Sequence, residues 1–202
     1  MRSILSALLA PPCCLGCGRA GVDWCTDCQQ TSPRASCRRL SSGLEVASTY
    51  SFEGPVRRAI IEWKEEGRRA ARHVVAEWFR EGLTPLLHEH PDAVFVPVPS
   101  SARSDRVRGS RLLCETVMEA MPRANVAFLL HAVRSRRDQQ GLGYGERMRN
   151  LRDSVEAHAV PQQTIILVDD LITTGATFRE CERAILAQCS TFVRAFAIAH
   201  RN

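Results

Sequence analysis

The sequence predicts an α/β fold in which a mostly parallel sheet is flanked by helices, with a small cysteine-rich unit at the N-terminal end. Short apolar runs rich in Val and Ile, such as Ile165–Val168, alternate along the chain with longer amphipathic stretches, which is typical of parallel strands joined by helices. The 202 residues, 45% of them hydrophobic, suffice for one ordinary domain and a small appendage. Five of the nine cysteines fall within residues 13–28, which indicates a metal-binding unit.

The N-terminal segment, residues 1–37, is expected to form a short amphipathic helix followed by a zinc ribbon. Ile4–Ala10 is the apolar part of that helix, and no run approaches the roughly 20 apolar residues of a membrane span, so a cytoplasmic location is expected. Two Cys-x2-Cys pairs can place four thiolates tetrahedrally around Zn²⁺: Cys14, Cys17, Cys25 and Cys28. Cys13 can substitute for Cys14, and Cys37 is either a spare or an alternate ligand.

The main domain is expected over residues 45–202, after a linker at 38–44. The Gly54–Pro55 pair opens a helix because Pro suits the first helical turn, and Gly67 is placed to end that helix. Pro97 favours a strand end or an edge because it cannot donate to a sheet. The expected elements, in order, are strand 45–52, helix 56–66, helix 68–88, strand 93–98, helix 110–121, strand 126–130, strand 165–168, helix 177–188 and strand 192–199.

The segment from Ile165 to Thr177 carries the clearest chemical signal. Its apolar start fits a buried parallel strand, and ligands of open α/β sheets bind where such strands end. Asp169 and Asp170 follow at once, and paired carboxylates can accept hydrogen bonds from the vicinal hydroxyls of a ribose. The next turn can hold a phosphate through backbone N–H groups and hydroxyls; it consists of Thr173, Thr174, Gly175, Ala176 and Thr177. The alternative is that the two Asp close a strand and Thr177 caps a helix.

The order of four apolar residues, Asp-Asp, two apolar residues and Thr-Thr-Gly-Ala-Thr resembles the phosphoribosyl pyrophosphate (PRPP) motif of type I phosphoribosyltransferases. The resemblance implies that Asp169 and Asp170 form the catalytic pair and face the ribose 2′ and 3′ hydroxyls. It also implies that residues 173–177 hold the 5′-phosphate and that Mg²⁺ accompanies the pyrophosphate.

Positive charge is concentrated in one part of the chain. The basic residues are 26 Arg and a single Lys, Lys64, and residues 100–152 hold 11 Arg against 5 acidic residues. Such a field suits polyphosphate or nucleic acid, although solvated helix faces give the same pattern. The candidate pyrophosphate-binding residues are Lys64, Ser100, Ser101, Arg103 and Arg108. Lys64 can equally be plain surface charge, and the turn after residue 99 can be a surface turn with scattered Arg.

Residues 134–152 form a polar stretch with three Gly that is expected to be a mobile loop running into a short helix. A loop of this kind can close over bound pyrophosphate and exclude water, and Arg137, Gln140 and Arg147 are the residues placed to do so. A basic loop without that role fits the spacing nearly as well.

Over nearly its full length the chain resembles the ComF family of phosphoribosyltransferase-like competence proteins. The matching motifs are the two Cys-x2-Cys pairs, Lys64–Gly67, Val96–Pro99, Arg108-Gly109, Gln140–Leu142 with Arg147 and Asn150, and Asp169–Thr177. The chain has Ser110–Leu112 where members often have Phe-Asn-Gln, and a single Cys37 where many have a further pair. The resemblance implies a type I phosphoribosyltransferase fold, PRPP binding and, in some bacteria, a role in DNA uptake.

Three functions fit these observations. The first is a PRPP-binding protein of DNA import, whose ribbon and basic surface contact single-stranded DNA or a DNA-uptake motor. The second is an active phosphoribosyltransferase of nucleotide salvage, in which positioning and stabilisation of the leaving pyrophosphate drive the reaction. The third is a PRPP-sensing regulator. An aromatic content of only 6% argues against an extended base-stacking platform. The sequence leaves turnover, the acceptor and the oligomeric state open.

Overall fold

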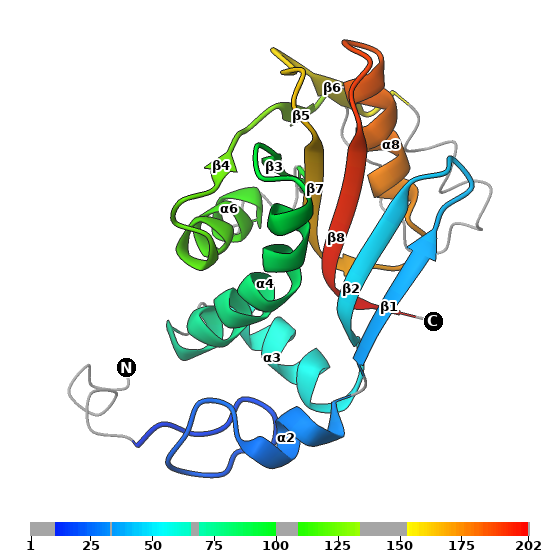
Figure 1. Cartoon of the computed structure of the whole chain (residues 1–202). Helices are drawn as coiled ribbons and strands as arrows, with labels where there is room; N and C mark the ends of the chain where they lie inside the picture. The colour runs from blue at the N-terminus through cyan, green and yellow to red at the C-terminus, as the bar shows by residue number, and fades with distance from the viewer. Residues whose placement is uncertain (1–10, 33, 66–68, 100–108, 134–152, 202) are drawn as a thin grey trace.

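The computed structural model describes residues 11–32, 34–65, 69–99, 109–133 and 153–201. Its centre is a six-stranded sheet in the order β1-β2-β8-β7-β3-β4 (Figure 1). Neighbouring strands run parallel except β1 and β2, which are antiparallel. The strands are β1 (Arg34–Arg39), β2 (Glu45–Ser51), β3 (Val94–Pro97), β4 (Asn125–Val126), β7 (Ile165–Ile172) and β8 (Val193–His200). A separate antiparallel pair joins β5 (Leu130–Ala132) to β6 (Val155–Ala157).

Four helices of the described residues cover both faces of the sheet: α3 (Gly54–Glu65), α4 (Arg69–Glu89), α6 (Gly109–Ala120) and α8 (Ala176–Leu186). A short helix, α2 (Thr26–Thr31), belongs to the cysteine-rich unit. Helices α3, α4 and α6 share one apolar core with Ile166 and Val168 of β7, whereas α8 shares the other core with Ile165 and Leu167 (Figure 1). Because successive side chains of a strand point to opposite faces, an apolar strand such as β7 must be buried on both sides. The predicted parallel-dominated sheet flanked by helices is confirmed.

The prediction that residues 38–44 form a linker is partly wrong. Arg38 and Arg39 end strand β1, and a hairpin turn held by the Leu40 N–H on the Leu44 carbonyl leads into β2. The sequence of β1 is polar, because an edge strand needs few apolar residues and charge protects it from pairing with other chains.

The predicted strand over 126–130 is also corrected. Its two ends belong to different sheets, β4 and β5. Strand β6 has no counterpart among the predicted elements, since it is only three residues long.

The cysteine-rich unit packs on helices α3 and α4. Leu15 lies in the same apolar core as these helices and is 3% exposed. The ring of Trp24 meets the ring of Trp78, on α4, edge to face at 5.0 Å. A Cβ on Gly16 would lie 2.7 Å from Cβ of Pro55, so only glycine permits this close approach. None of the helices in the described residues is long and apolar enough to cross a membrane.

Candidate functional site

The two adjacent carboxylates lie where β7 extends beyond its neighbour β3. Strand β3 ends at Pro97, which is level with Val168, whereas β7 continues to Ile172 alongside β8. Asp169 and Asp170 therefore belong to strand β7. The sequence had predicted that they come directly after the end of the strand, at Val168. Their position is at the carboxyl edge of the sheet, on the side that β3 leaves uncovered.

This edge is also the point where the chain connections diverge. Helix α6 follows β3 and leads outward to β4, whereas α8 follows β7 and leads to β8 in the opposite direction. The two helices lie on opposite faces of the sheet. Open α/β sheets bind ligands beyond the carboxyl ends of strands at such a switch point. The topology thus favours this edge as a binding site.

Lys64, near the end of α3, neutralises one of the two carboxylates. Its Nζ lies 2.7 Å from Oδ2 of Asp170, whose side chain is 9% exposed, whereas the Lys64 side chain is 49% exposed. Burial lowers the pKa of Lys64, but the carboxylates of Asp170 and Asp169 outweigh it and raise that pKa above its ordinary value. The chain's single Lys is therefore placed at the predicted site, as a counter-ion to Asp170.

Asp169 is the less well compensated of the pair. Burial first, and then the neighbouring Asp170 carboxylate, raise the pKa of Asp169 well above its usual range, although Lys64 opposes this. Its Oδ1 accepts a hydrogen bond from the backbone N–H of Asp170 at 2.9 Å. One ammonium group thus faces two adjacent carboxylates, an arrangement that a ligand offering hydroxyl donors or a cation would relieve.

The turn after β7 is shaped for close approach by a ligand. Gly175 has a φ of 71° and forms the N-cap of α8 without a side-chain hydrogen bond. The backbone N–H of Ala176 donates to Oγ1 of Thr174 at 3.3 Å. Thr177 lies within the first turn of α8 and is not its cap. The first N–H groups of a helix have no acceptor within the helix, which makes this turn a suitable anion site.

The β1–β2 hairpin packs against the turn, and sequence reasoning did not find this contact. Nη1 of Arg38 donates to the carbonyl of Thr173 at 2.9 Å, and a Cβ on Gly175 would lie 2.6 Å from Leu40. Between hairpin and turn lies a pocket of about 430 Å³. Its lining comprises Arg38, Arg39, Leu40, Ser41, Thr173, Thr174, Arg179 and Arg201. The signal in the sequence was the Arg38-Arg39 pair, which was assigned to a linker.

Several predicted site residues lie outside the described residues: Ser100, Ser101, Arg103, Arg108, Arg137, Gln140 and Arg147. The described chain does reach the same edge just before the first of them, since the N–H of Val98 donates to the carbonyl of Val168 at 2.9 Å. The structure therefore brings Lys64, Asp169, Asp170 and residues 173–177 to one edge of the sheet, and the roles predicted for them stay predictions.

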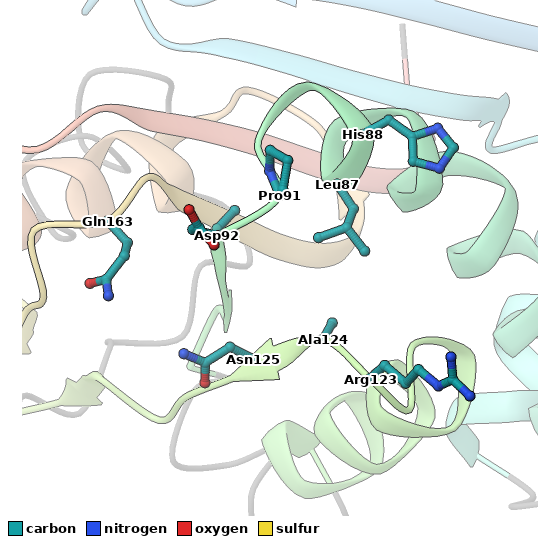
Figure 2. Close-up of a pocket in the computed structure, with 9 residues that line it drawn as sticks. Leu87, His88, Pro91, Asp92, Arg123, Ala124, Asn125 and Gln163 are labelled. Atoms are coloured by element: carbon teal, nitrogen blue, oxygen red, sulfur yellow. The ribbon is translucent and has the colours of Figure 1, made fainter.

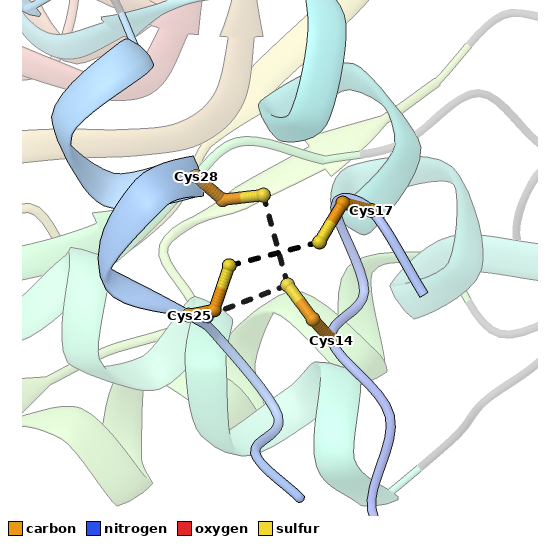
Figure 3. A group of neighbouring side chains, drawn as sticks. All are labelled: Cys14, Cys17, Cys25 and Cys28. Atoms are coloured by element: carbon orange, nitrogen blue, oxygen red, sulfur yellow. Dashed lines mark hydrogen bonds between the residues drawn. The ribbon is translucent and has the colours of Figure 1, made fainter. Parts of the chain in front are cut away.

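The four predicted metal ligands form one cluster (Figure 3). The Sγ atoms of Cys14, Cys17, Cys25 and Cys28 all lie within 4.8 Å of one another. The Cys14–Cys28 and Cys17–Cys25 Sγ distances are 3.7 and 3.6 Å, close to the ~3.8 Å edge of a tetrahedron with ~2.3 Å zinc–sulfur bonds. The donor set and its spacing fit Zn²⁺.

The two open questions about this cluster are answered by its geometry. Cys13 is not a member, and its thiol instead donates to the carbonyl of Pro11 at 3.5 Å. Cys37 lies exposed on β1, also outside the cluster. Burial raises the pKa of Cys14, but hydrogen bonds from backbone N–H groups, those of Cys17 and Cys25 first, lower it to about 6. A thiolate at this position is the form that binds a metal ion.

Another pocket, of about 730 Å³, lies at the opposite edge of the sheet, and Figure 2 shows the residues that line it. It borders the amino ends of β3 and β4, and Asp92, Arg123, Asn125 and Gln163 line it. Its lining mixes single charges of both signs, without adjacent carboxylates or a helix N-terminus. Size alone therefore does not identify the site in this molecule.

No family model matches the chain, and no curated protein matches it. The chain is similar to solved structures of low sequence identity. Orotate phosphoribosyltransferase from Aeropyrum pernix is 16% identical over 82% of this chain and 72% of that one, with a TM-score of 0.40. An allosteric regulatory enzyme of purine biosynthesis is 16% identical over 81% of this chain and 35% of that one, also at 0.40. The Mycobacterium tuberculosis orotate phosphoribosyltransferase in complex with Fe(III) dicitrate is 17% identical over 86% of this chain and 89% of that one, with a TM-score of 0.37.

Proposed function

We propose that this protein binds PRPP at the carboxyl edge of β7 and is a phosphoribosyltransferase-like protein of the ComF type. One observation carries the proposal: Asp169 and Asp170 lie at the switch point of the sheet, directly before a glycine turn that opens α8. Vicinal ribose hydroxyls would donate to the two carboxylates. The 5′-phosphate would accept from the N–H groups of residues 173–177. The order of these groups along the chain supports one ligand that spans both.

The proposal assigns Lys64 a role during binding. Its Nζ lies 2.7 Å from Oδ2 of Asp170 and neutralises that carboxylate. Hydroxyl donors on Asp170 would compete for that carboxylate and free the ammonium group for the pyrophosphate. Mg²⁺ would be held mainly by the pyrophosphate oxygens, because it prefers oxygen ligands and keeps several waters. When bound, it stabilises the charge of the departing pyrophosphate.

In the reaction that we propose, this chain's own groups act by position and charge. The carboxylates would orient the ribose, and the turn would fix its phosphate, so that the anomeric carbon faces the acceptor. Cationic groups would stabilise the leaving pyrophosphate. If the protein is a phosphoribosyltransferase of nucleotide salvage, the only further requirement is an acceptor for the phosphoribosyl group. A PRPP-sensing regulator would use the same binding step without turnover.

A role in DNA uptake is the ComF-specific part of the proposal. It rests on the resemblance of motifs and on the excess of Arg between residues 100 and 152. The protein would act in the cytoplasm and contact single-stranded DNA or a motor protein of DNA uptake. Because phosphate contacts release counterions, such DNA binding must weaken steeply as salt rises.

Calorimetric titration with PRPP and Mg²⁺ tests the binding proposal. We expect saturable binding to the wild type and a loss of about tenfold or more in Asp170→Asn, because a hydrogen bond to a charged group contributes about 1.5–3 kcal/mol. Asp92→Asn is the matched control, since Asp92 is a carboxylate at the opposite edge of the sheet. Equal binding by the two variants, or none at millimolar PRPP in the wild type, would refute it.

Two assays separate the candidate functions once binding is established. Release of pyrophosphate in the presence of purine or pyrimidine bases indicates a transferase. Salt-sensitive retention of single-stranded DNA without pyrophosphate release indicates the DNA-uptake role. PRPP binding without pyrophosphate release or DNA retention favours the third function, a PRPP-sensing regulator.

A further inference from the structure

The pocket between the β1–β2 hairpin and the turn has the chemistry of an anion site. We propose that it binds a phosphoryl group and that Arg38 and Arg201 supply the positive charge for it. Binding of a sugar phosphate in this pocket rests on the proposed function, whereas binding of free phosphate does not. Four of the eight lining residues are Arg, and none is acidic.

The contacts of Arg38 and Arg201 leave their charges available. Arg38 donates to the neutral carbonyl of Thr173 at 2.9 Å, and the guanidinium of Arg201 lies 5.1 Å from the ring centre of Phe52. Within the part of the chain that the structure describes, neither forms an ion pair. Neutral partners hold a guanidinium in place without cancelling its charge, so both can still attract an anion.

The nearby acidic groups are engaged by other residues. Glu45 forms ion pairs with Arg39 and Arg194. The carboxylate of Glu182 interacts with Arg179 and lies beside Ser42. Arg39 and Arg179 therefore have carboxylates beside them and serve mainly as walls of the pocket. The surplus charge belongs to Arg38 and Arg201.

The walls of the pocket are fixed to the turn that begins α8. Arg201 is tied to the end of β7 because its N–H donates to the carbonyl of Ile172 at 2.9 Å. Leu40 packs against Gly175 from the hairpin side, and Nη1 of Arg179 donates to the hydroxyl of Ser41 at 3.1 Å. The arginines, Thr173 and Thr174 thus line one space. This combination of forked donors and hydroxyls suits a tetrahedral phosphoryl group.

The test measures inorganic phosphate binding at low salt in the full-length protein. We expect saturable binding that weakens about tenfold or more in Arg38→Gln and in Arg201→Gln, because each removes a charge-assisted contact. Arg123→Gln removes the same charge at the opposite edge of the sheet and is expected to bind as the wild type does. Arg201→Gln leaves the hydrogen bond from Arg38 to Thr173 intact. Weaker phosphate binding in this variant therefore cannot be due to a disturbed turn. Circular dichroism confirms that each variant is folded.

Ribose 5-phosphate and Asp170→Asn separate this proposal from the proposed function. If both hold, ribose 5-phosphate binds more tightly than phosphate, and Asp170→Asn removes that gain without weakening phosphate binding. Phosphate binding that depends on Arg38 and Arg201, with no PRPP binding, supports the pocket and refutes the PRPP site. Phosphate binding that is absent in the wild type, or unchanged in both Arg variants, overturns the pocket.

Discussion

At the scale of single residues, the site is defined by an imbalance of charge. Two adjacent carboxylates share one ammonium group, that of Lys64, which forms an ion pair with Asp170. Burial and the Asp170 carboxylate raise the pKa of Asp169 well above its usual range. Such shifts are common where a protein keeps a site ready for a charged or polar ligand. The sequence showed both Asp and the single Lys. It could not show that Lys64 and Asp170 meet, because their contact joins segments about a hundred residues apart and depends on the packing of α3 on the sheet.

Asp169→Asn is expected to stabilise the free protein at neutral and higher pH. As the pH rises, the unfolded chain loses the Asp169 proton first while the native state retains it, so stability falls until the raised pKa is passed. Asn keeps the hydrogen bond from the Asp170 N–H and has no proton to lose. Urea unfolding between about pH 5 and pH 8 should show a gap that widens in favour of the variant. A wild type that is as stable as the variant at the upper end would contradict this account of Asp169.

Lys64→Met is expected to destabilise the free protein by about 1–3 kcal/mol, because it leaves the buried carboxylate of Asp170 without a counter-ion. The figure is below the range for fully buried pairs since Lys64 is half-exposed. Urea unfolding of Lys64→Met, Asp170→Asn and the double variant gives the coupling of the pair. The Lys64 change should cost less in the Asp170→Asn background. Purely additive losses would mean that the ion pair does not contribute.

At the scale of elements, the strand, turn and helix from β7 to α8 could be predicted because their signals are local. Four apolar residues, a glycine turn and an amphipathic stretch follow in sequence. Strand β1 could not be predicted, since its polar residues gain their structure from pairing with β2. The missed hairpin is therefore what hid the arginine pocket. Leu40 lies against Gly175 and gives the turn that we propose as the phosphate site a rigid support.

Gly175→Ala is expected to destabilise the fold more than Gly43→Ala. Both glycines have positive φ, which costs an L-residue about 1–2 kcal/mol. At Gly175 the added Cβ would also lie 2.6 Å from Leu40, whereas nothing lies within 4 Å of one at Gly43. Thermal unfolding of both variants measures the difference, and adding Leu40→Ala should reduce the extra cost at Gly175. Equal costs at the two positions would show that the hairpin does not press on the turn.

At the scale of the whole molecule, alternating strands and helices predicted the parallel sheet, but not the order of its strands. That order decides the site, because it makes β3 and β7 neighbours with helices leaving to opposite faces. The four zinc-ligand candidates could be predicted from their spacing alone. The docking of their unit on α3 and α4 could not, since it depends on Leu15, Gly16 and Trp24 fitting a surface built from distant segments.

We expect about one zinc ion per chain and a fall in the unfolding temperature of the whole protein when a chelator removes it. Structural zinc contributes apparent binding energies of about 10–16 kcal/mol, and Trp24 joins this unit to Trp78 on α4. Elemental analysis should find zinc lost in Cys25→Ser and retained in Cys37→Ser, because Cys37 lies outside the cluster. A zinc-free wild type with unchanged unfolding temperature would refute the zinc assignment.

The central claim is that one edge of the sheet holds a phosphorylated pentose between two carboxylates and a helix-opening turn. A crystal structure of the wild type soaked with PRPP and Mg²⁺ tests it most directly. We predict ribose hydroxyls within hydrogen-bonding distance of Asp169 and Asp170, and the 5′-phosphate against the N–H groups of residues 173–177. Ligand density at another place on the chain, with Lys64 still on Asp170 and the turn empty, would contradict it.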